Sequence, residues 1–313
     1  MKAKYLKFLN QKINVENKTI AVLGATGSIG SSISKYLTYL KANVIIVGQN
    51  EGNLIKLKEE LLTISPANPH YFVVDFKSRQ SINELIKYLN SFKIYAIINT
   101  IGVYHIPLRF VNSYDETYLI NMLNNVYFMR EFYKDERHKK TKIINTGSIS
   151  YCYSSIKLDD IQYLNKDNKT KHYGNTKRLL MLYSHYLKEN GYNVELAHPG
   201  ISTTNLFNKK HNGYANFFYV LIVPLMKIIF MKPDKAALPL LLALNETNIE
   251  LNNWYGPKGI FHSWGYPNLQ KYKIKEVNDS NLYSNIINEI DRELLNVWKY
   301  YYFITQVLII QNT

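Results

Sequence analysis

The sequence has little that would suit an oxidising compartment or a lipid bilayer. Cys152 is the only cysteine in 313 residues, so the chain cannot form an internal disulfide and fits a reducing cytosol. The longest apolar runs, 214–226 and 300–310, are shorter than the roughly 20 residues that a membrane-spanning helix needs. The start of the chain, MKAKYLKFLNQK, lacks the uninterrupted apolar core of a secretion signal. We therefore expect a cytoplasmic location.

Acidic residues are also scarce relative to basic ones. The chain has 24 Asp and Glu against 38 Lys and Arg, which gives a formal net charge of +14. A basic protein can bind nucleic acid or an anionic membrane surface. The lysines, however, are scattered along the chain, and only HKKTK (138–142) forms a dense group. We attribute the charge to the general composition and expect no nucleic-acid partner.

What the sequence does contain is a regular alternation of apolar strands and helical segments. Residues 18–40 indicate a strand, a glycine-rich loop and a helix, and the alternation continues to about residue 200. Such apolar strands, separated by helices, predict an α/β fold with a doubly wound, mostly parallel sheet in a single domain. Beyond residue 200 we expect an apolar segment, a helix near 234–246 and a strand around Trp254. The other expected strands are 43–48, 70–76, 93–102, 142–147 and 193–200, and the other expected helices are 53–62, 81–92, 118–134 and 172–190.

Three glycines stand at the first junction between a strand and a helix. Gly24, Gly27 and Gly30 are spaced three residues apart. Glycine permits a tight turn there, lets the backbone approach a pyrophosphate, and leaves the N–H groups of the helix start free to bind it. A chain reversal alone would need only one glycine, so the triplet in this context predicts a dinucleotide site. The expected contacts come from Gly24, Thr26, Gly27, Ser28, Ile29 and Gly30.

The residues after the second and third strands bear on which dinucleotide binds. NAD sites usually have an acid at the end of the second strand, where it binds the ribose 2′-hydroxyl. Here Gln49 and Asn50 occupy that place, and no acid comes before Glu51. Because no carboxylate would repel a 2′-phosphate, NADP(H) is favoured and NAD(H) is the alternative. Asp75, followed by Phe76, would lie by the adenine, unless it serves only to cap the next loop.

Two tyrosine–lysine pairs have the four-residue spacing that places both side chains on one face of a helix. They are Tyr153 with Lys157 and Tyr173 with Lys177. A chain with 27 Tyr and 38 Lys and Arg is expected to contain about three Tyr-x-x-x-(Lys/Arg) matches by chance. The spacing alone therefore does not choose between the two pairs. A free tyrosine has a pKa of ~10, and a lysine on the same face would favour its phenolate.

Further motifs follow the glycine loop: NTIG (99–102), INMLNN (120–125), NTGS (145–148) and HPGISTTNLF (198–207). Together with the glycines they resemble the short-chain dehydrogenase/reductase family over residues 18–267. The resemblance implies a Rossmann-type fold and an NAD(P)-dependent oxidoreductase. The His-Pro-Gly turn, LDDIQY (158–163) and YGPKGIFHSWGYP (255–267) are similar to the branch of retinol dehydrogenases and protochlorophyllide reductases.

Within this resemblance, Tyr173 takes the place of the catalytic tyrosine. Tyr153 follows Ser148 by only five residues, too few for the chain to enter a helix and return, whereas Tyr173 follows it by 25. The resemblance implies that Tyr173 is the acid/base, supported by Lys177, and that Ser148 polarises the substrate oxygen. It also implies that Asn121 holds a water linking Lys177 to solvent, and it implies no metal. Implied cofactor contacts are Asn99, Thr100, Gly102, Tyr173, Lys177, Pro199, Gly200 and Thr204.

The resemblance favours hydride transfer between a nicotinamide and the alcohol or carbonyl group of a hydrophobic small molecule. Two other functions remain as alternatives. One is an NAD(P)-sensing regulatory protein without turnover, and the retained Tyr–Lys pair argues against it. The other is an epimerase or dehydratase acting on a nucleotide sugar. The His-Pro-Gly turn and the apolar segment 214–231 argue against this polar substrate.

We divide the chain into an N-terminal extension (1–17), the oxidoreductase domain (18–267) and a helical, aromatic tail (268–313). The segment 214–231 belongs to the stretch near 205–232, where the resemblance implies substrate-covering helices. It predicts either a helix pair packed on the core or a lid over an apolar substrate, with peripheral membrane contact as a further alternative. For the tail, a homodimer contact, core packing and a membrane interface are all open.

Overall fold

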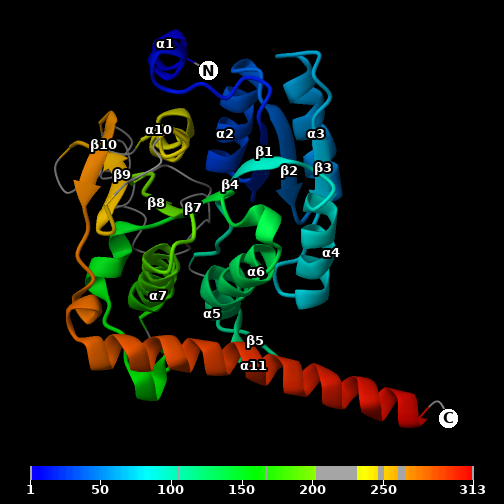
Figure 1. Ribbon diagram of the computed structural model, residues 1–313, viewed down its shortest axis with the longest axis vertical. Coiled ribbons are helices and arrows are strands. Elements are labelled where there is room, and N and C mark those ends of the chain that lie inside the picture. Colours follow the sequence, from blue (N-terminus) through cyan, green and yellow to red (C-terminus); the bar gives the residue numbers. More distant parts are fainter. Residues whose placement is uncertain are drawn as a thin grey trace, which may run out of the picture.

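The computed structural model of the protein describes residues 2–104, 106–165, 168–201, 231–245, 250–259 and 265–311, with the final helix from residue 296 described as backbone. Its strands are β1 (Thr19–Leu23), β2 (Asn43–Gly48), β3 (His70–Val73), β4 (Ile94–Asn99), β5 (Phe110–Val111), β6 (Tyr114–Asp115), β7 (Lys142–Thr146), β8 (Val194–Ala197), β9 (Asn253–Pro257) and β10 (Pro267–Lys271). Eight of them form one sheet in the order β10-β9-β8-β7-β4-β1-β2-β3 (Figure 1). Only β9 and β10 pair antiparallel in this sheet, which confirms the predicted mostly parallel, doubly wound architecture.

Helices cover both faces of the sheet, and each face has its own apolar core. The helices are α1 (Ala3–Lys12), α2 (Ser28–Tyr39), α3 (Glu51–Leu62), α4 (Arg79–Leu89), α5 (Glu116–Tyr118), α6 (Asn124–Tyr133), α7 (Lys169–Glu189), α9 (Pro233–Ala236), α10 (Leu238–Leu242) and α11 (Ser280–Gln311). One core contains side chains of α1, α2, α3 and α10, and the other contains side chains of α4, α6, α7 and the first half of α11. Successive strand residues point to opposite faces, so Val22 lies in the first core and Leu23 in the second.

The helix expected at 118–134 is interrupted by an irregular turn. α5 passes into a π-helical turn, Leu119–Leu123, before α6 begins at Asn124. A π turn has wider hydrogen-bond rings than an α-helix and is frequent at functional sites. It contains Asn121, for which the resemblance implies a place in the active site.

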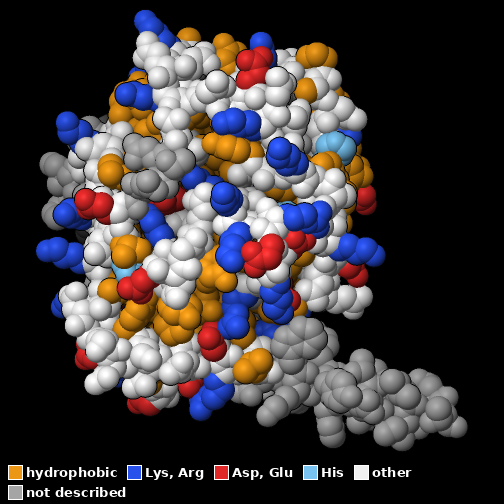
Figure 2. Space-filling model, in the orientation of Figure 1, with side chains coloured by type: hydrophobic (Ala, Val, Ile, Leu, Met, Phe, Trp, Pro, Cys, Tyr) orange, Lys and Arg blue, Asp and Glu red, His pale blue; other side chains and the backbone are white. Residues whose placement is uncertain are grey.

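The first helix and the first part of the last helix are packed into the folded body. α1 buries Tyr5 and Leu9 in the core that it shares with α10. β10 crosses the boundary expected at residue 267, and Ile286 and Ile290 of α11 are fully buried. In the described ranges, no helix is long and apolar enough to cross a membrane. Figure 2 shows Lys and Arg side chains spread over one face among Asp and Glu, rather than in one basic stripe.

The strand order brings two loops together at the carboxyl end of the sheet. From β1 the chain moves outward through β2 to β3, and it then returns to β4 on the other side of β1. In sheets of this kind, ligands bind at the crevice where the connections diverge, outside the carboxyl ends of the strands. The Thr100 hydroxyl donates to the carbonyl oxygen of Leu23 at 2.8 Å, which joins the loop after β4 to the end of β1.

Candidate active site

The loop between β1 and α2 contains the three glycines, and close contacts explain two of them. Gly24 has a φ of +76°, and a Cβ there would lie 2.7 Å from Thr100 Oγ1. A Cβ on Gly30 would collide with the carbonyl oxygen of Gly24. A side chain at either position would force the loop away from its neighbours. The tight turn expected from the sequence is therefore required by the packing.

The start of α2 has hydrogen-bond donors that no side chain satisfies. Gly27 is its exposed N-cap residue, no side chain caps the helix, and its first turn contains no acid. By contrast, the side chains of Asn50, Ser78 and Asn168 cap α3, α4 and α7. An exposed, uncapped helix start directly after a sharp turn fits a bound pyrophosphate. The remaining residues of the loop and first turn are Thr26, Ser28 and Ile29, all partly exposed.

The end of β2 contacts this loop and carries no acid. A Cβ on Gly48 would lie 3.2 Å from Thr26 Oγ1, so the two segments touch. Gln49 and Asn50 follow and are exposed, and Asn50 Oδ1 accepts the backbone N–H of Asn53 at 2.9 Å. The Asn50 side chain is therefore used as a helix cap, and Gln49 is the neutral side chain at the end of the strand.

The residues after β3 are held by local hydrogen bonds. The Asp75 carboxylate accepts the backbone N–H of Lys77 at 3.0 Å, so Asp75 caps its own loop, as the second interpretation of this residue predicts. Phe76 is buried, and its carbonyl oxygen accepts from Asn124 Nδ2 at 2.7 Å. Asp75 remains partly exposed. An adenine contact from this loop stays a prediction.

A buried network of amides fixes the loop after β4. Asn99 Nδ2 donates to Asn125 Oδ1 at 2.6 Å and to Asn145 Oδ1 at 3.0 Å. Asn99 Oδ1 accepts the backbone N–H of Ile101 at 3.1 Å, and the three asparagines are at most 2% exposed. The side chain of Asn99 is thus engaged inside the protein, and the cofactor contact that the resemblance implies for this residue stays a prediction. Its role is to shape the loop of Thr100.

Ser148, Tyr173 and Lys177 come together at the carboxyl edge of the sheet. α7 carries Tyr173 and Lys177 on one face, with Lys177 Nζ 5.9 Å from the centre of the Tyr173 ring. Ser148 follows β7, and its side chain is hydrogen-bonded to that of Tyr173. Lys177 Nζ also donates to the carbonyl oxygen of Thr146 at 3.0 Å. The arrangement unites a phenol, a second hydroxyl and a cation next to the glycine loop.

Burial sets the pKa values of this group. It raises the pKa of Tyr173 to about 12, and the hydrogen bond with Ser148 opposes this rise while the nearby Tyr104 adds to it. Burial also lowers the pKa of Lys177 to about 8. The sequence predicts that Lys177 favours the phenolate of Tyr173, but here burial prevails. Tyr173 is therefore a protonated phenol at neutral pH.

Asn121 is fully buried in the π turn and clamps the loop after β4. Its Oδ1 accepts the backbone N–H of Val103 at 2.7 Å, and its Nδ2 donates to the Val103 carbonyl oxygen at 2.8 Å. Gly102 lies against both groups, since a Cβ there would be 3.3 Å from Asn121 Oδ1 and 3.4 Å from Lys177 Nζ. The role of Asn121 in holding a water stays a prediction.

Two residues of this site were not expected from the sequence. Tyr104 packs the edge of its ring against Tyr173, with ring centres 4.7 Å apart and an interplanar angle of 85°. Gly174 lets α7 approach the turn after β7, because a Cβ there would collide with the carbonyl oxygen of Ser150. Neither carries a specific signal, because the chain has 27 Tyr and 14 Gly.

The other expected residues are only partly described. Pro199 is buried after β8, and Gly200 has the φ of +80° that its turn needs. Thr204 and most of the cover expected near 205–232 lie outside the described residues. The competing tyrosine, Tyr153, is 62% exposed and does not join the group around Ser148.

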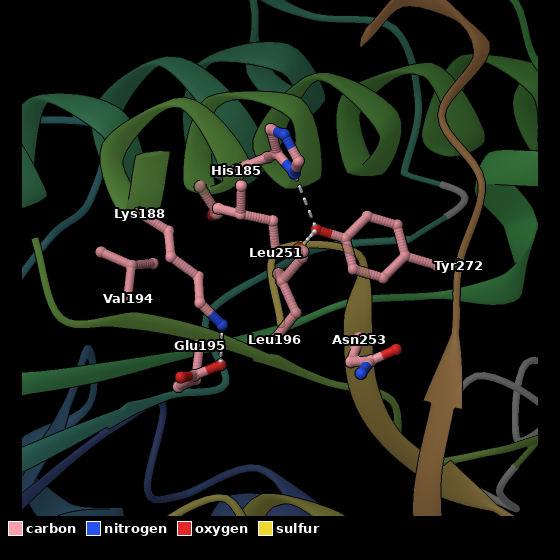
Figure 3. Close-up of a pocket in the computed structure, with 9 residues that line it drawn as sticks. His185, Lys188, Val194, Glu195, Leu196, Leu251, Asn253 and Tyr272 are labelled. Carbon is pink, nitrogen blue, oxygen red and sulfur yellow. Dashed lines mark hydrogen bonds and ion pairs between the residues drawn. The ribbon is translucent and has the colours of Figure 1, made fainter. Parts of the chain in front are cut away.

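A hollow lies between α7 and β8 and shares no residue with this group (Figure 3). Its lining side chains contact one another. Lys188 pairs with Glu195 at 2.8 Å, and His185 Nδ1 lies 3.4 Å from the Tyr272 hydroxyl. It is a crevice between packed elements. Among the residues that the structure describes, no group of three or more His, Cys, Asp and Glu side chains could hold a metal ion.

Sequence comparisons agree with this geometry. Residues 18–158 match the model of the short chain dehydrogenase family. The chain is 24% identical over 240 residues to polyprenol dehydrogenase of Homo sapiens, covering 71% of this chain and 70% of the relative. It is 24% identical over 242 residues to retinol dehydrogenase 13 of Mus musculus, covering 73% and 71%. The family match ends before α7, so the geometry described above locates Tyr173 and Lys177 independently of it.

A solved structure shares the fold. The crystal structure of an uncharacterized protein from Mycobacterium Paratuberculosis superposes with a TM-score of 0.68 over 91% of this chain and 96% of that one. The sequence identity is 15%, so this likeness concerns the fold alone.

Proposed function

We propose that the chain is a member of the short-chain dehydrogenase/reductase family of NAD(P)-dependent oxidoreductases and that it interconverts an alcohol and a carbonyl group on a hydrophobic small molecule. One observation carries the proposal. Ser148, Tyr173 and Lys177 lie together at the carboxyl edge of the sheet, beside the uncapped start of α2, where the order of the strands reverses between β1 and β4. The relatives named for polyprenol and retinol support an apolar substrate, because both compounds are long, apolar alcohols.

Each side chain has a distinct part in the proposed reaction. A nicotinamide cofactor, when bound, supplies or accepts the hydride. Tyr173, protonated at neutral pH, gives its proton to the substrate oxygen during reduction and takes it back during oxidation. Ser148, which already bonds to Tyr173, holds the same oxygen in reach. Lys177, with a pKa of about 8, is mostly charged at pH 7 and stabilises the phenolate that the transfer leaves behind.

The same proposal includes where the cofactor lies and which form is preferred. The uncapped start of α2 and the loop of Gly24 and Gly30 would hold the pyrophosphate. Gln49 is exposed and neutral at the end of β2, where NAD-binding sites usually have a carboxylate. A 2′-phosphate would meet no like charge from the end of this strand. We therefore favour NADP(H) over NAD(H).

A spectrophotometric screen tests the reaction. Aldehydes and ketones of increasing apolar length, retinal among them, are mixed with NADPH or NADH, and the loss of reduced-cofactor absorbance is followed. Tyr173→Phe keeps the ring but removes the proton, so turnover should fall by roughly two or more powers of ten while the cofactor still binds. Tyr153→Phe is the matched control, since Tyr153 has a lysine at the same spacing but is exposed.

Two outcomes would contradict the proposal. Loss of activity in Tyr153→Phe together with retained activity in Tyr173→Phe would show that the wrong tyrosine is assigned. Tight cofactor binding without conversion of any alcohol or carbonyl would favour the sensing alternative. Lys177→Ala should lower turnover and weaken cofactor binding together, because both roles are assigned to that side chain.

A further inference from the structure

The most exposed large apolar side chains of the described chain belong to three segments: the stretch after β4, the turn after β7, and α11. Four are more than half exposed: Leu295 at 64%, Tyr153 at 62%, Leu108 at 60% and Phe110 at 55%. The other exposed large apolar side chains in the described ranges are at 43% or below. Leu108 and Phe110 follow the carboxyl end of β4, and Tyr153 follows that of β7. Three of the four thus come from the segments that follow the strand ends carrying the active site.

Buried contacts fix α11, which carries Leu295, to the same edge. The Tyr118 hydroxyl donates to the Glu293 carboxylate, and Arg79 donates to the carbonyl oxygen of Leu294 at 2.6 Å. Tyr118 directly precedes the π turn that contains Asn121. Figure 1 shows α11 passing beneath α7 and α5, with β5 beside it. The helix and the strand of Phe110 therefore border the active-site edge together.

The sequence of α11 changes character after its packed part. Ile286, Ile290 and Leu294 are buried against the domain. The next 16 residues, 296–311, read NVWKYYYFITQVLIIQ: eleven are apolar or aromatic, one is a lysine and none is acidic. They continue the helix, and in Figure 1 its end runs on beyond α5. A helix of 16 residues is about 24 Å long, whereas a helix that spans a membrane needs roughly 20 residues, about 30 Å. The segment is therefore too short to span a membrane but can lie in its interface.

Cations accompany the exposed apolar residues. Arg109, between Leu108 and Phe110, is exposed, and Lys299 is the cation of the apolar end of α11, residues 296–311, which contains no acidic residue. Arg292 on α11 is 68% exposed but is paired with Glu289 at 2.5 Å, so it adds no net charge. Aromatic rings are favoured at the headgroup level of a bilayer, and arginine and lysine are attracted to its anionic lipids. A contact with a second copy of the chain would bury the same apolar residues. A two-fold contact, however, would bring the cations of both copies to one interface, where they would repel each other. The combination favours a membrane.

We propose that this edge docks on an anionic lipid membrane. The end of α11 after Leu295 lies in the interface, and the loops of Leu108, Phe110 and Tyr153 face the headgroups. The side of the molecule that carries Tyr173 then faces the lipid, and an apolar alcohol or aldehyde reaches it from the bilayer without crossing water. The inference rests on the proposed function only for the nature of this substrate, because docking is measured without turnover.

Sedimentation with vesicles tests the docking. The full chain is mixed with vesicles of phosphatidylcholine containing about one quarter phosphatidylserine, or with pure phosphatidylcholine. We expect binding to the anionic vesicles and weaker binding to the neutral ones. Leu108→Glu on the loop and Leu308→Glu in the end of α11 should each reduce the partition coefficient roughly tenfold, because each replaces a leucine that the proposal places against the lipid by a charge that an anionic surface repels. Ile55→Glu on α3, 41% exposed in the wild type, is the matched control and should bind normally.

The outcomes separate the competing explanations. Wild-type protein that stays in the supernatant with both vesicles would overturn the proposal, as would equal loss of binding in Ile55→Glu and Leu108→Glu. A dimer that Leu308→Glu converts to a monomer, without vesicle binding, would assign the face to a second copy instead. Far-ultraviolet circular dichroism verifies that each variant is folded, and the two leucine variants test the face independently. Vesicle binding without turnover of any substrate would leave docking in place and refute the proposed reaction.

Discussion

Replacing Glu293 by glutamine should stabilise the protein above neutral pH. Glu293 is 9% exposed on α11, and its carboxylate accepts the hydroxyl of Tyr118. Burial raises its pKa to about 7; Glu289 adds to the rise, whereas the Tyr118 hydrogen bond and Arg292 oppose it. Tyr114 also faces this point, with its hydroxyl donating to the Glu293 carbonyl oxygen at 3.3 Å. Below about pH 7, a carboxyl group in these surroundings keeps its proton.

The folded and unfolded chains ionise this group at different pH. Its ordinary pKa is 4.5, so between about pH 4.5 and pH 7 the unfolded chain loses the proton that the folded chain keeps. The stability contributed by Glu293 is complete below pH 4.5 and is lost as the pH rises through 7. A pKa difference of about 2.5, at 1.36 kcal/mol for each unit, amounts to about 3 kcal/mol. Glutamine accepts the same hydrogen bond without ionising, so the variant avoids this loss.

Urea unfolding followed by tryptophan fluorescence provides the measurement. The free energy of unfolding of Glu293→Gln minus that of the wild type should increase by about 2 to 3 kcal/mol from pH 5 to pH 8. Subtracting the wild-type free energy of unfolding from that of the variant at each pH cancels the contributions of all other titrating groups. Glu59→Gln, an exposed carboxylate on α3, is the control and should change this difference by less than about 0.5 kcal/mol. A difference for Glu293→Gln that does not vary with pH would refute the burial of an ionisable carboxyl against Tyr118.

Three further results are expected. Gln49→Asp supplies a ribose acceptor and repels a 2′-phosphate, so the ratio of the NADPH and NADH dissociation constants should move toward NADH by roughly tenfold, about 1.4 kcal/mol; an unchanged ratio would contradict the assigned position of the ribose. Gly102→Ala places a methyl group 3.3 Å from Asn121 and 3.4 Å from Lys177, so kcat should fall while urea unfolding shifts by less than about 1 kcal/mol. Segment 214–231, if it is a cover, should gain protection from hydrogen exchange when cofactor and substrate are added; equal protection beforehand would mean that it belongs to the core.

Local features of the chain were predictable from the sequence because their causes are local. Alternating apolar strands and helices indicated the doubly wound sheet, and the glycine triplet indicated the sharp turn that Gly24 and Gly30 make. The four-residue spacing placed Tyr173 and Lys177 on one face of α7. The interrupted helix at Asn121 was not predictable, because a π turn has no specific sequence pattern and forms where the packing requires it.

The sequence by itself determined the strands, the glycine loop and the residues that meet on α7, since each depends on neighbours within a few positions. Tertiary structure alone decided what surrounds them. Tyr104 lies against Tyr173 although 69 positions separate the two residues, and burial in that setting moves the pKa of Tyr173 upward when the sequence suggested the opposite. Tyr118 and Glu293 meet across 175 positions and hold α11 to the active-site edge. Burial and contacts of this kind depend on how the whole chain packs, so no local pattern of residues can specify them.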